Sequence, residues 1–320
     1  MRYISPDHAP GILRHTARRF VFNLRLSPTT VADADLVIGL DMDGFTLSGR
    51  VHPFVSFVLG VLADEASFER GRVAQLLRLQ ANAEKRTTMA ADLVVTTSQY
   101  SRNRLLELYG LSADRVVVVP PPFDVERWQQ DMIKGGASHS SSDRPTVFTV
   151  AHMYPRKNLS ALIRAAQVLA RVMPDVNFRV AGHGPEFGDI ERRIEVSGLQ
   201  ENVSLLGPIP HQRLIREFSS CSVFCLPSLQ EGFGIALLEA MASGKPVVAC
   251  RTSSTPELIE DEVNGLLAAP HDHHDLAAKL LHCLDDSELR LRMGDANQTK
   301  AREYSASKTV PRLVDLLTSI

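Results

Sequence analysis

The sequence has little cysteine and no long apolar run, and each shortage excludes a class of protein. The 320 residues include only 4 cysteines, and their spacing fits no metal-binding pattern, which excludes a disulfide-rich scaffold and a zinc-binding module. The longest apolar run, 53–63, is interrupted by Ser56 and Gly60 and is too short to cross a bilayer. No secretory signal is visible. These absences predict a cytoplasmic protein whose cysteines are reduced and buried.

The chain also lacks a strong net charge of either sign. Its 35 basic residues are almost balanced by 37 acidic ones, so the bulk charge does not favour nucleic acid as a partner. The length exceeds the usual size of one hydrophobic core, and two domains are therefore expected.

Short apolar runs alternate with helical segments along most of the chain. The expected strands are 35–40, 53–62, 92–97, 115–119, 147–150, 177–181, 203–206, 223–226 and 247–249. The expected helices are 68–89, 101–109, 159–171, 187–197, 212–220 and 235–241. Ser101 can cap the helix over 101–109 and Gly110 can end it. The alternation predicts an α/β fold with parallel sheets, in which ligands bind beyond the carboxyl ends of the strands.

The composition changes sharply between the two halves. Residues 134–144 contain Gly-Gly and four serines but no large apolar side chain, which is typical of a mobile linker. We therefore expect one domain over 1–133 and a second over 145–303. A C-terminal helix over 304–320 is expected to pack back on the first domain.

The first thirty residues are basic. Arg2, Arg14, Arg18, Arg19 and Arg25 are interleaved with apolar residues, and Asp7 is the single acid. Such a segment can form an amphipathic helix that rests on an anionic membrane surface. It can also pack on its own domain, and we favour this second interpretation.

Asp41 and Asp43 follow the strand expected over 35–40. Two carboxylates at this spacing can bind a hard cation. Further oxygen ligands are not evident nearby, so we favour a polar turn, and no metal site is expected.

The stretch 227–248 combines a strand exit, a glycine-rich loop and a helix. Gly232 and Gly234 flank Phe233, and good helix formers start at Ile235. The first N–H groups of such a helix, at the positive end of its dipole, suit a phosphate or a diphosphate. Glu231 before the helix and Glu239 within it can each accept two hydroxyl groups. The pattern predicts a nucleotide-sugar site.

Three other loops at strand ends point to the same region. His152, Arg156 and Lys157 follow the strand 147–150, and adjacent cations can hold a diphosphate as it leaves. Gly182 and Gly184 after the next strand permit close approach of the backbone. A further loop, 206–210, is expected to place Ile209 against the base.

The motifs together resemble the EX7E region and the donor domain of retaining glycosyltransferases of family four. The matching segments are Lys157-Asn158, 181–185, Leu206-Gly207, Pro227-Ser228, 231–239, Pro256-Glu257, 91–98 and the valine run before Pro120. The resemblance covers roughly residues 35–303. It implies a GT-B fold, in which two Rossmann-like domains with parallel sheets face a cleft and the domain over 1–133 lies on the acceptor side.

The resemblance also implies an activity and roles for individual residues. The expected reaction is retaining, metal-independent transfer of a hexose from a UDP- or GDP-linked donor to a hydroxyl acceptor, which is a glycan, a lipid or a small molecule. Lys157 and Arg156 would bind the donor diphosphate, Glu231 the transferred sugar and Glu239 the ribose, while backbone N–H groups around Phe233 would contact sugar or phosphate. The alternative is a non-catalytic nucleotide-sugar-binding subunit of another glycosyltransferase.

Three features depart from the family pattern. Ala151-His152 stands where relatives usually have Gly-Arg, and Leu59 stands where they often have a histidine that reaches the sugar. The first thirty residues also show no opening strand with a glycine-rich loop. Leu59 and the missing opening loop favour the non-catalytic alternative, whereas His152 can still donate a hydrogen bond.

Overall fold

The computed structural model describes residues 12–134 and 144–320. The chain divides into two compact units, one of residues up to Pro120 together with Leu313–Ile320, and the other Pro121–Arg312. The predicted boundary lay later, at 134–144, and most of that segment is outside the described residues, as are Arg2 and Asp7.

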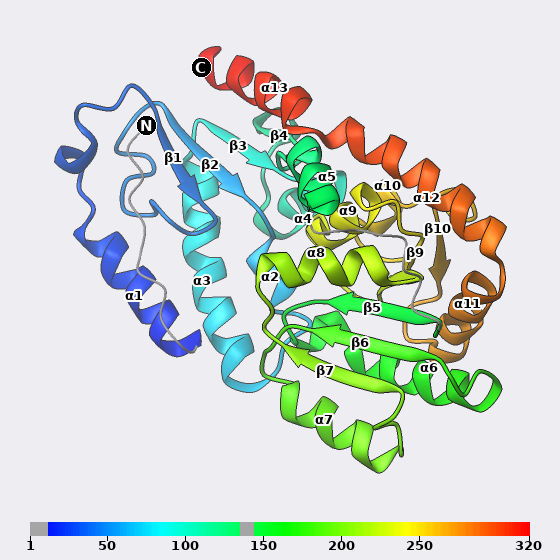
Figure 1. Cartoon of the computed structure of the whole chain (residues 1–320). Coiled ribbons are helices and arrows are strands. Elements are labelled where there is room, and N and C mark those ends of the chain that lie inside the picture. Colours follow the sequence, from blue (N-terminus) through cyan, green and yellow to red (C-terminus); the bar gives the residue numbers. More distant parts are fainter. Residues whose placement is uncertain (1–11, 135–143) are drawn as a thin grey trace. The chain divides into compact units, whose positions relative to one another are not determined.

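The first unit is built around a four-stranded parallel sheet (Figure 1). Its strands, side by side in chain order, are β1 (Val37–Leu40), β2 (Phe54–Val58), β3 (Leu93–Thr96) and β4 (Val116–Val118). Its helical elements are α1 (Ile12–Arg25), η1 (Pro28–Val31), α2 (Leu62–Glu65), α3 (Gly71–Ala90), α4 (Gln99–Tyr109) and η2 (Ala113–Arg115). Every residue of β2 is buried, so both faces of this strand are covered, as expected for a parallel sheet.

The ends of α4 show how local chemistry sets a helix. The side-chain oxygen of Ser98 accepts a hydrogen bond from the N–H of Ser101. The N-cap is therefore Ser98, and the prediction of Ser101 was wrong because Ser-X-X-Ser offers two caps and the helix starts at the earlier one. Gly110 ends the helix with φ 73°, as predicted.

Helix α1 packs on its own unit. The guanidinium of Arg19 pairs with Asp43 at 2.9 Å, and the amide of Asn23 donates to Asp43 at 2.8 Å and accepts from the N–H of Gly44 at 2.6 Å. Phe20 lies 5.7 Å from Phe45 between ring centres. Asp43 is thus the anchor of α1, which agrees with the polar-turn interpretation of 41–44.

The second unit contains a six-stranded parallel sheet with strand order β10-β9-β8-β5-β6-β7. The strands are β5 (Thr146–Val150), β6 (Asn177–Ala181), β7 (Val203–Gly207), β8 (Val223–Leu226), β9 (Val247–Cys250) and β10 (Gly265–Ala268). The helical elements are α5 (Val125–Lys134), η3 (Pro155–Lys157), α6 (Leu159–Val172), α7 (Phe187–Val196), α8 (His211–Ser220), α9 (Ile235–Ala242), α10 (Thr255–Leu258), α11 (His273–Asp285), α12 (Ser287–Ala301) and η4 (Arg302–Tyr304).

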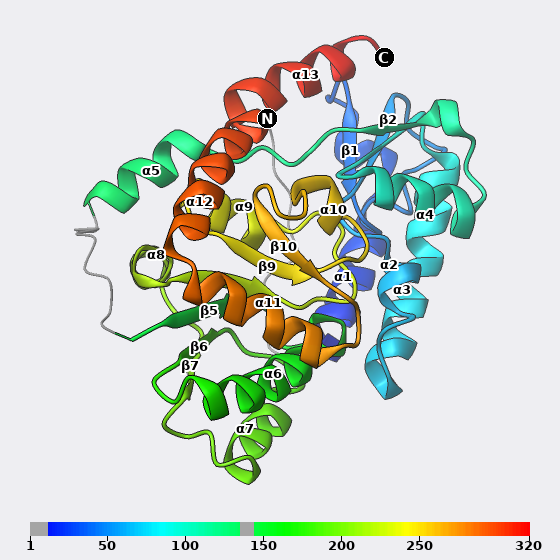
Figure 2. The same cartoon turned by 90° about the vertical axis from the view of Figure 1, so that its right-hand side faces the viewer.

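Helices cover both faces of this sheet. Helices α6, α7 and α11 share one hydrophobic cluster with one face, and α5, α8 and α9 share another with the opposite face. Figure 2 shows α6 and α11 side by side along the first of these faces. Side chains therefore alternate between two cores along each strand, which leaves the strand ends as the open edge of the sheet.

The contacts of helix α5 explain why the boundary between the two units falls before this helix. Trp128 is buried, its indole N–H donates to the hydroxyl of Ser243 at 2.9 Å, and its ring lies 5.6 Å from that of Phe218. These partners belong to α8 and to the residue that follows α9. The last helix, α13 (Ala306–Thr318), crosses the division, and its residues from Leu313 onward pack on a cluster in the first unit that includes Val55 and Val95.

Candidate functional site

The site lies where the strand order of the second sheet reverses. Strand β5, the first strand of this sheet in chain order, is flanked by β6 on one side and by β8 on the other. Ligands in open α/β sheets bind at this switch point. The loops 151–158 and 227–234 leave β5 and β8 there. The N–H of Leu229 donates to the carbonyl of Arg156 at 2.8 Å, and the side chain of Asn158 donates to the carbonyl of Pro227 at 3.2 Å. These bonds hold the two predicted binding loops together.

Lys157 and Glu231 form an ion pair across this junction. The distance from Nζ of Lys157 to Oε1 of Glu231 is 2.6 Å, and the two side chains are 15% and 9% exposed. Lys157 closes the short helix η3, and Asn158 follows it in a left-handed conformation with φ 54°. The structure thus brings together two charged groups that lie 74 residues apart in the sequence.

The backbone of Glu231 is held from a third loop. Its N–H donates to the hydroxyl of Ser253 at 2.9 Å, and its carbonyl accepts from the hydroxyl of Ser254 at 3.0 Å. Ser253 has φ 49°. The sequence analysis did not single out either serine. The signal available was their place in the loop that follows the apolar run 247–250, beyond the carboxyl end of a strand.

Helix α9 begins immediately beyond Glu231. Gly234 adopts a left-handed conformation with φ 96°, and its carbonyl accepts from the N–H groups of Leu237 and Leu238. The preceding N–H groups have no intrahelical acceptor, so they form the positive end that the sequence predicts at Ile235. The ring of Phe233 is buried and lies 5.6 Å from the ring of Tyr304. Only the backbone of Phe233 is therefore left for a ligand.

Glu239 lies on α9 four residues after the helix begins, roughly 6 Å along the axis. Its side chain is half-buried, and no hydrogen bond or ion pair of its carboxyl group is found within residues 12–134 and 144–320. Burial raises the pKa of Glu239 to about 7. A carboxyl group that is desolvated without a protein partner is typical of a ligand-binding position.

Gly182 and Gly184 are required by the protein itself. A Cβ atom on Gly182, which has φ +117°, would lie 1.9 Å from the carbonyl oxygen of Ala151, and one on Gly184 would lie 2.6 Å from the nitrogen of Met153. The N–H of Met153 donates to the carbonyl of His183 at 3.0 Å. These glycines let the loop after β6 pack against the loop after β5, so their contribution to the site is to position 151–158.

The remaining predicted residues occupy less central positions. The guanidinium carbon of Arg156 lies 4.8 Å from the centre of the Tyr154 ring. His152 is exposed at the start of the same loop. Ile209 packs at the margin of the cluster formed by α5, α8 and α9. Gly232 lies between Glu231 and Phe233 in the loop that enters α9.

A separate cavity of about 670 Å³ lies beside α10 and α12. Pro256 and Glu257 line it, together with Glu260, Asp295 and Glu303. These four acids outnumber the one cation of the lining, Lys300, and the resulting negative charge disfavours a diphosphate. The cavity therefore does not compete with the Lys157–Glu231 region as a donor site.

The first unit carries its own group of buried acids at the carboxyl end of its sheet. Asp41 has φ 52°, accepts from the N–H of Leu59 at 3.0 Å and has its pKa raised to about 6 by burial. Glu84 is fully buried and accepts from Tyr109 and from the N–H of Leu62. Burial, and next the charge of Asp41, raise the pKa of Glu84 well above its usual value.

No cluster of three or more potential metal ligands occurs in the described part of the chain. Within the same residues, no helix is both long enough and apolar enough to cross a membrane. The four cysteines are all buried free thiols.

Solved structures identify the fold. The structure of Anabaena HepE in complex with UDP superposes with a TM-score of 0.75 and 23% identity, covering 91% of this chain and 80% of that one. WaaG, a glycosyltransferase involved in lipopolysaccharide biosynthesis, superposes with a TM-score of 0.74 and 18% identity, covering 98% and 85%. The fold is therefore that of the GT-B glycosyltransferases, as predicted.

Sequence comparison gives the family. The model of the family described as Glycosyl transferases group 1 matches residues 136–300, and that of Glycosyltransferase Family 4 matches residues 52–127. The chain belongs to the group 1 glycosyl transferases, and the predicted resemblance to family four is confirmed.

Several relatives are about one third identical to this chain over the residues that align. A D-inositol 3-phosphate glycosyltransferase of Nocardia farcinica is 32% identical over 242 residues, which are 72% of this chain and 53% of the relative. An alpha-D-kanosaminyltransferase of Streptomyces kanamyceticus is 34% identical over 243 residues, covering 74% and 63%. The chain thus spans about half to two thirds of the length of these relatives.

Proposed function

We propose that the protein is a retaining glycosyltransferase that moves a hexose from a nucleoside-diphosphate sugar to a hydroxyl acceptor. The observation that carries the proposal is the Lys157–Glu231 ion pair at the switch point of the second sheet, directly before the N-terminus of α9. It combines a cation for a diphosphate with an acid for sugar hydroxyls. Membership of the group 1 family supports the same reaction.

Lys157 stabilises the leaving diphosphate in this mechanism. Its ammonium group has three N–H donors, and one of them is used by Glu231 in the empty site. The other two are left for phosphate oxygens, and the positive end of α9 and the guanidinium of Arg156 add further positive charge. These groups compensate the charge that develops as the bond between the anomeric carbon and the phosphate oxygen breaks. The proposed reaction accordingly needs no metal ion.

Glu231 holds the transferred sugar. Its Oε1 atom is bound to Lys157, so Oε2 is left to accept from sugar hydroxyls. The hydrogen bonds from Ser253 and Ser254 to the backbone of Glu231 fix its position without using the carboxylate oxygens. Retention requires the acceptor oxygen to arrive on the face from which the diphosphate leaves, and the acceptor proton then passes to the leaving phosphate oxygen.

Glu239 completes the donor site by binding the ribose. It is half-buried on α9 and carries an unpaired carboxyl group in the structure described here. A ribose presents two neighbouring hydroxyls, and these can donate to both oxygens of an ionised carboxylate. His152, Gly232, Ile235 and Ile209 surround the same donor in this proposal.

The base of the donor is proposed to be uracil or guanine. HepE was solved in complex with UDP, and a relative from Mycolicibacterium smegmatis that is 30% identical is named as GDP-mannose-dependent. A thermal-shift screen of nucleoside diphosphates and their hexoses decides between the two bases, because a ligand that binds the folded state raises its stability.

Turnover of the donor that the screen selects provides the test. Lys157→Met and Glu231→Gln are each expected to lower donor hydrolysis or transfer by roughly 10²–10³-fold. Lys279→Met and Glu195→Gln remove the same charges elsewhere in the second unit and serve as matched controls. Circular dichroism checks that each variant is folded. Unchanged turnover in both site variants would remove the proposed site.

The same assay separates the enzyme from the non-catalytic alternative. The specific observation in favour of that alternative is Leu59, which is 46% exposed at the end of β2 where relatives often have a histidine. Donor binding without hydrolysis or transfer, across a broad panel of hydroxyl acceptors, would select it. We further propose that the protein acts in the cytoplasm, which is consistent with its four free thiols.

We also propose a peripheral contact between α1 and an anionic membrane. Leu13 and Leu24 are 64% and 70% exposed on the outer side of this helix, and Arg14, Arg18 and Arg25 are exposed beside them. The helix contains no acid. Apolar side chains bordered by arginines suit the interface of an anionic bilayer.

Vesicle sedimentation tests this contact. The wild-type protein is expected to sediment with vesicles that contain anionic lipid and to stay in solution with zwitterionic ones. Leu13→Ser/Leu24→Ser is expected to abolish sedimentation, whereas Leu291→Ser, which alters a side chain that is 71% exposed on α12, is not. Sedimentation that does not respond to anionic lipid would contradict the proposal.

A further inference from the structure

Arginine makes up three of the five residues that line a second cavity in the second unit. This cavity has a volume of about 270 Å³, and its lining residues are Arg179, Arg213, Arg216, Glu217 and Ser220. Arg179 comes from the middle of β6 and the others come from α8. The cavity thus lies on the face of the sheet that α8 covers, away from the strand ends that form the donor site.

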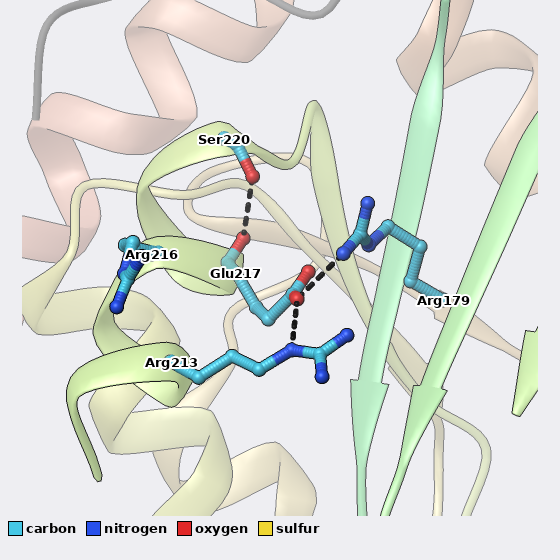
Figure 3. A pocket seen from close by; sticks show the side chains of 5 residues that line it. All are labelled: Arg179, Arg213, Arg216, Glu217 and Ser220. Atoms are coloured by element: carbon cyan, nitrogen blue, oxygen red, sulfur yellow. Dashed lines mark hydrogen bonds and ion pairs between the residues drawn. The ribbon is translucent and has the colours of Figure 1, made fainter. Parts of the chain in front are cut away.

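The pattern of β6 explains why an arginine stands there. Phe178 and Val180 point into the cluster of α6, α7 and α11. Arg179 between them therefore points to the opposite face, where α8 packs. Figure 3 shows Arg179 and Arg213 directed at Glu217. Two guanidinium groups from two elements thus meet at one carboxylate, while Arg216 lines the cavity without contacting it.

The carboxylate does not satisfy these arginines. Glu217 is 4% exposed, and its Oε1 atom accepts from Arg179 at 2.6 Å and, weakly, from Arg213 at 3.4 Å. Its Oε2 atom and the Nε atom of Arg179 are buried without a hydrogen-bond partner within the described residues. Arg179 and Arg213 contact this carboxylate and Arg216 lines the same cavity, so the lining side chains carry a net charge of +2. It also presents one unused buried donor and one unused buried acceptor.

These features define the chemistry of a ligand. Guanidinium groups bind phosphate through paired N–H donors, and a phosphate oxygen can accept from the unused N–H of Arg179. A hydroxyl group on the ligand can donate to the unused oxygen of Glu217. The volume lies just below the usual range of about 300–1,000 Å³ for organic ligands, which favours a small anion over a nucleotide sugar.

We propose that this cavity binds the phosphoryl group of a phosphate monoester. It is a second anion site in the unit, separate from the diphosphate site at Lys157. The same phosphoryl group can come from a soluble metabolite or from a lipid headgroup, and the experiment below distinguishes the two sources.

Calorimetric titration at constant ionic strength tests the proposal. The probes are inorganic phosphate, glycerol 1-phosphate, and vesicles with or without phosphatidic acid. Arg213→Gln/Arg216→Gln is the test variant, because both side chains are exposed and their loss leaves the Arg179–Glu217 pair intact. Arg192→Gln/Arg193→Gln removes two exposed arginines from α7 and is the matched control.

The test variant is expected to bind the phosphate probes at least about tenfold more weakly than the wild type, whereas the control stays within about twofold. Lys157→Ala, which disables the donor site, is also expected to stay within about twofold. Tight binding of the ester in solution identifies a soluble source, and binding only on vesicles identifies a lipid headgroup. Equal affinity in test and control variants, loss of binding in Lys157→Ala, or no binding of any phosphate probe would overturn the proposal.

Discussion

The elevated pKa of Glu239 gives the donor site a defined dependence on pH. The carboxyl group titrates at about 7 in the empty protein because burial disfavours its charged form. Ribose hydroxyls donate to the ionised form and therefore lower this pKa in the complex. By linkage, binding is strongest above pH 7 and weakens as the pH falls through 7.

The size of the effect follows from the titration. With a pKa of about 7, roughly nine tenths of the carboxyl groups are ionised at pH 8 and roughly one tenth at pH 6. If only the ionised form binds the ribose, Kd rises about tenfold between these pH values, equivalent to about 1.4 kcal/mol. Glu239→Gln is expected to bind more weakly at pH 8 and to lose this pH dependence.

The assay is calorimetric titration of a nucleoside-diphosphate hexose from pH 6 to 8 at constant ionic strength. The hexose ester is required because a free nucleoside diphosphate has a terminal phosphate that titrates in the same range. A constant Kd in the wild type, or an undiminished pH dependence in Glu239→Gln, would refute the reasoning.

Three further predictions concern stability, each measured by chemical denaturation. Glu239→Gln should stabilise the empty protein at pH 8 but not at pH 4. An acid whose folded pKa is raised lowers the free energy of unfolding as the pH rises from the unfolded pKa to about 7, and the full loss persists above that pH. Gly182→Ala should destabilise the folded protein by roughly 2–5 kcal/mol, because the new Cβ clashes and the residue has a positive φ. Gly188→Ala, with no atom within 4 Å of the new Cβ, should be neutral or slightly stabilising. Equal effects of the two substitutions would contradict this account. Arg19→Ala should destabilise by roughly 1–3 kcal/mol and increase hydrogen exchange in α1, whereas the exposed Arg18→Ala should change neither.

The regular parts of the fold were predictable because local periodicity sets them. The strands 177–181 and 223–226 were predicted with the bounds that the structure shows, and α3 differs from its prediction by a few residues. Helix α5 was assigned to the wrong side of the domain boundary. Its membership depends on the contact of Trp128 with Ser243, which is 115 residues away, and local composition carries no information about such a contact.

The residues of the candidate site were proposed from the sequence by residue type, but their pairing was not. Each of the loops around Lys157, Glu231 and Glu239 was recognised from strand ends, glycines and charge. The ion pair between Lys157 and Glu231 depends on β5 and β8 being neighbours in the sheet, which the order of the strands in the chain does not reveal. The contacts of Ser253 and Ser254 with the backbone of Glu231 were missed for the same reason, since both serines lie in the loop after β9.

In the empty site, Lys157 and Glu231 act as each other's counter-ion in a largely enclosed position. A single substitution therefore does more than subtract one function, because it leaves the surviving charge without compensation and costs folding stability on its own account. The contribution of each residue to turnover is best measured against the double variant Lys157→Met/Glu231→Gln, in which both charges are removed together. Comparing the two single variants with this double variant in a thermodynamic cycle separates the chemistry contributed by each group from the cost of isolating its partner.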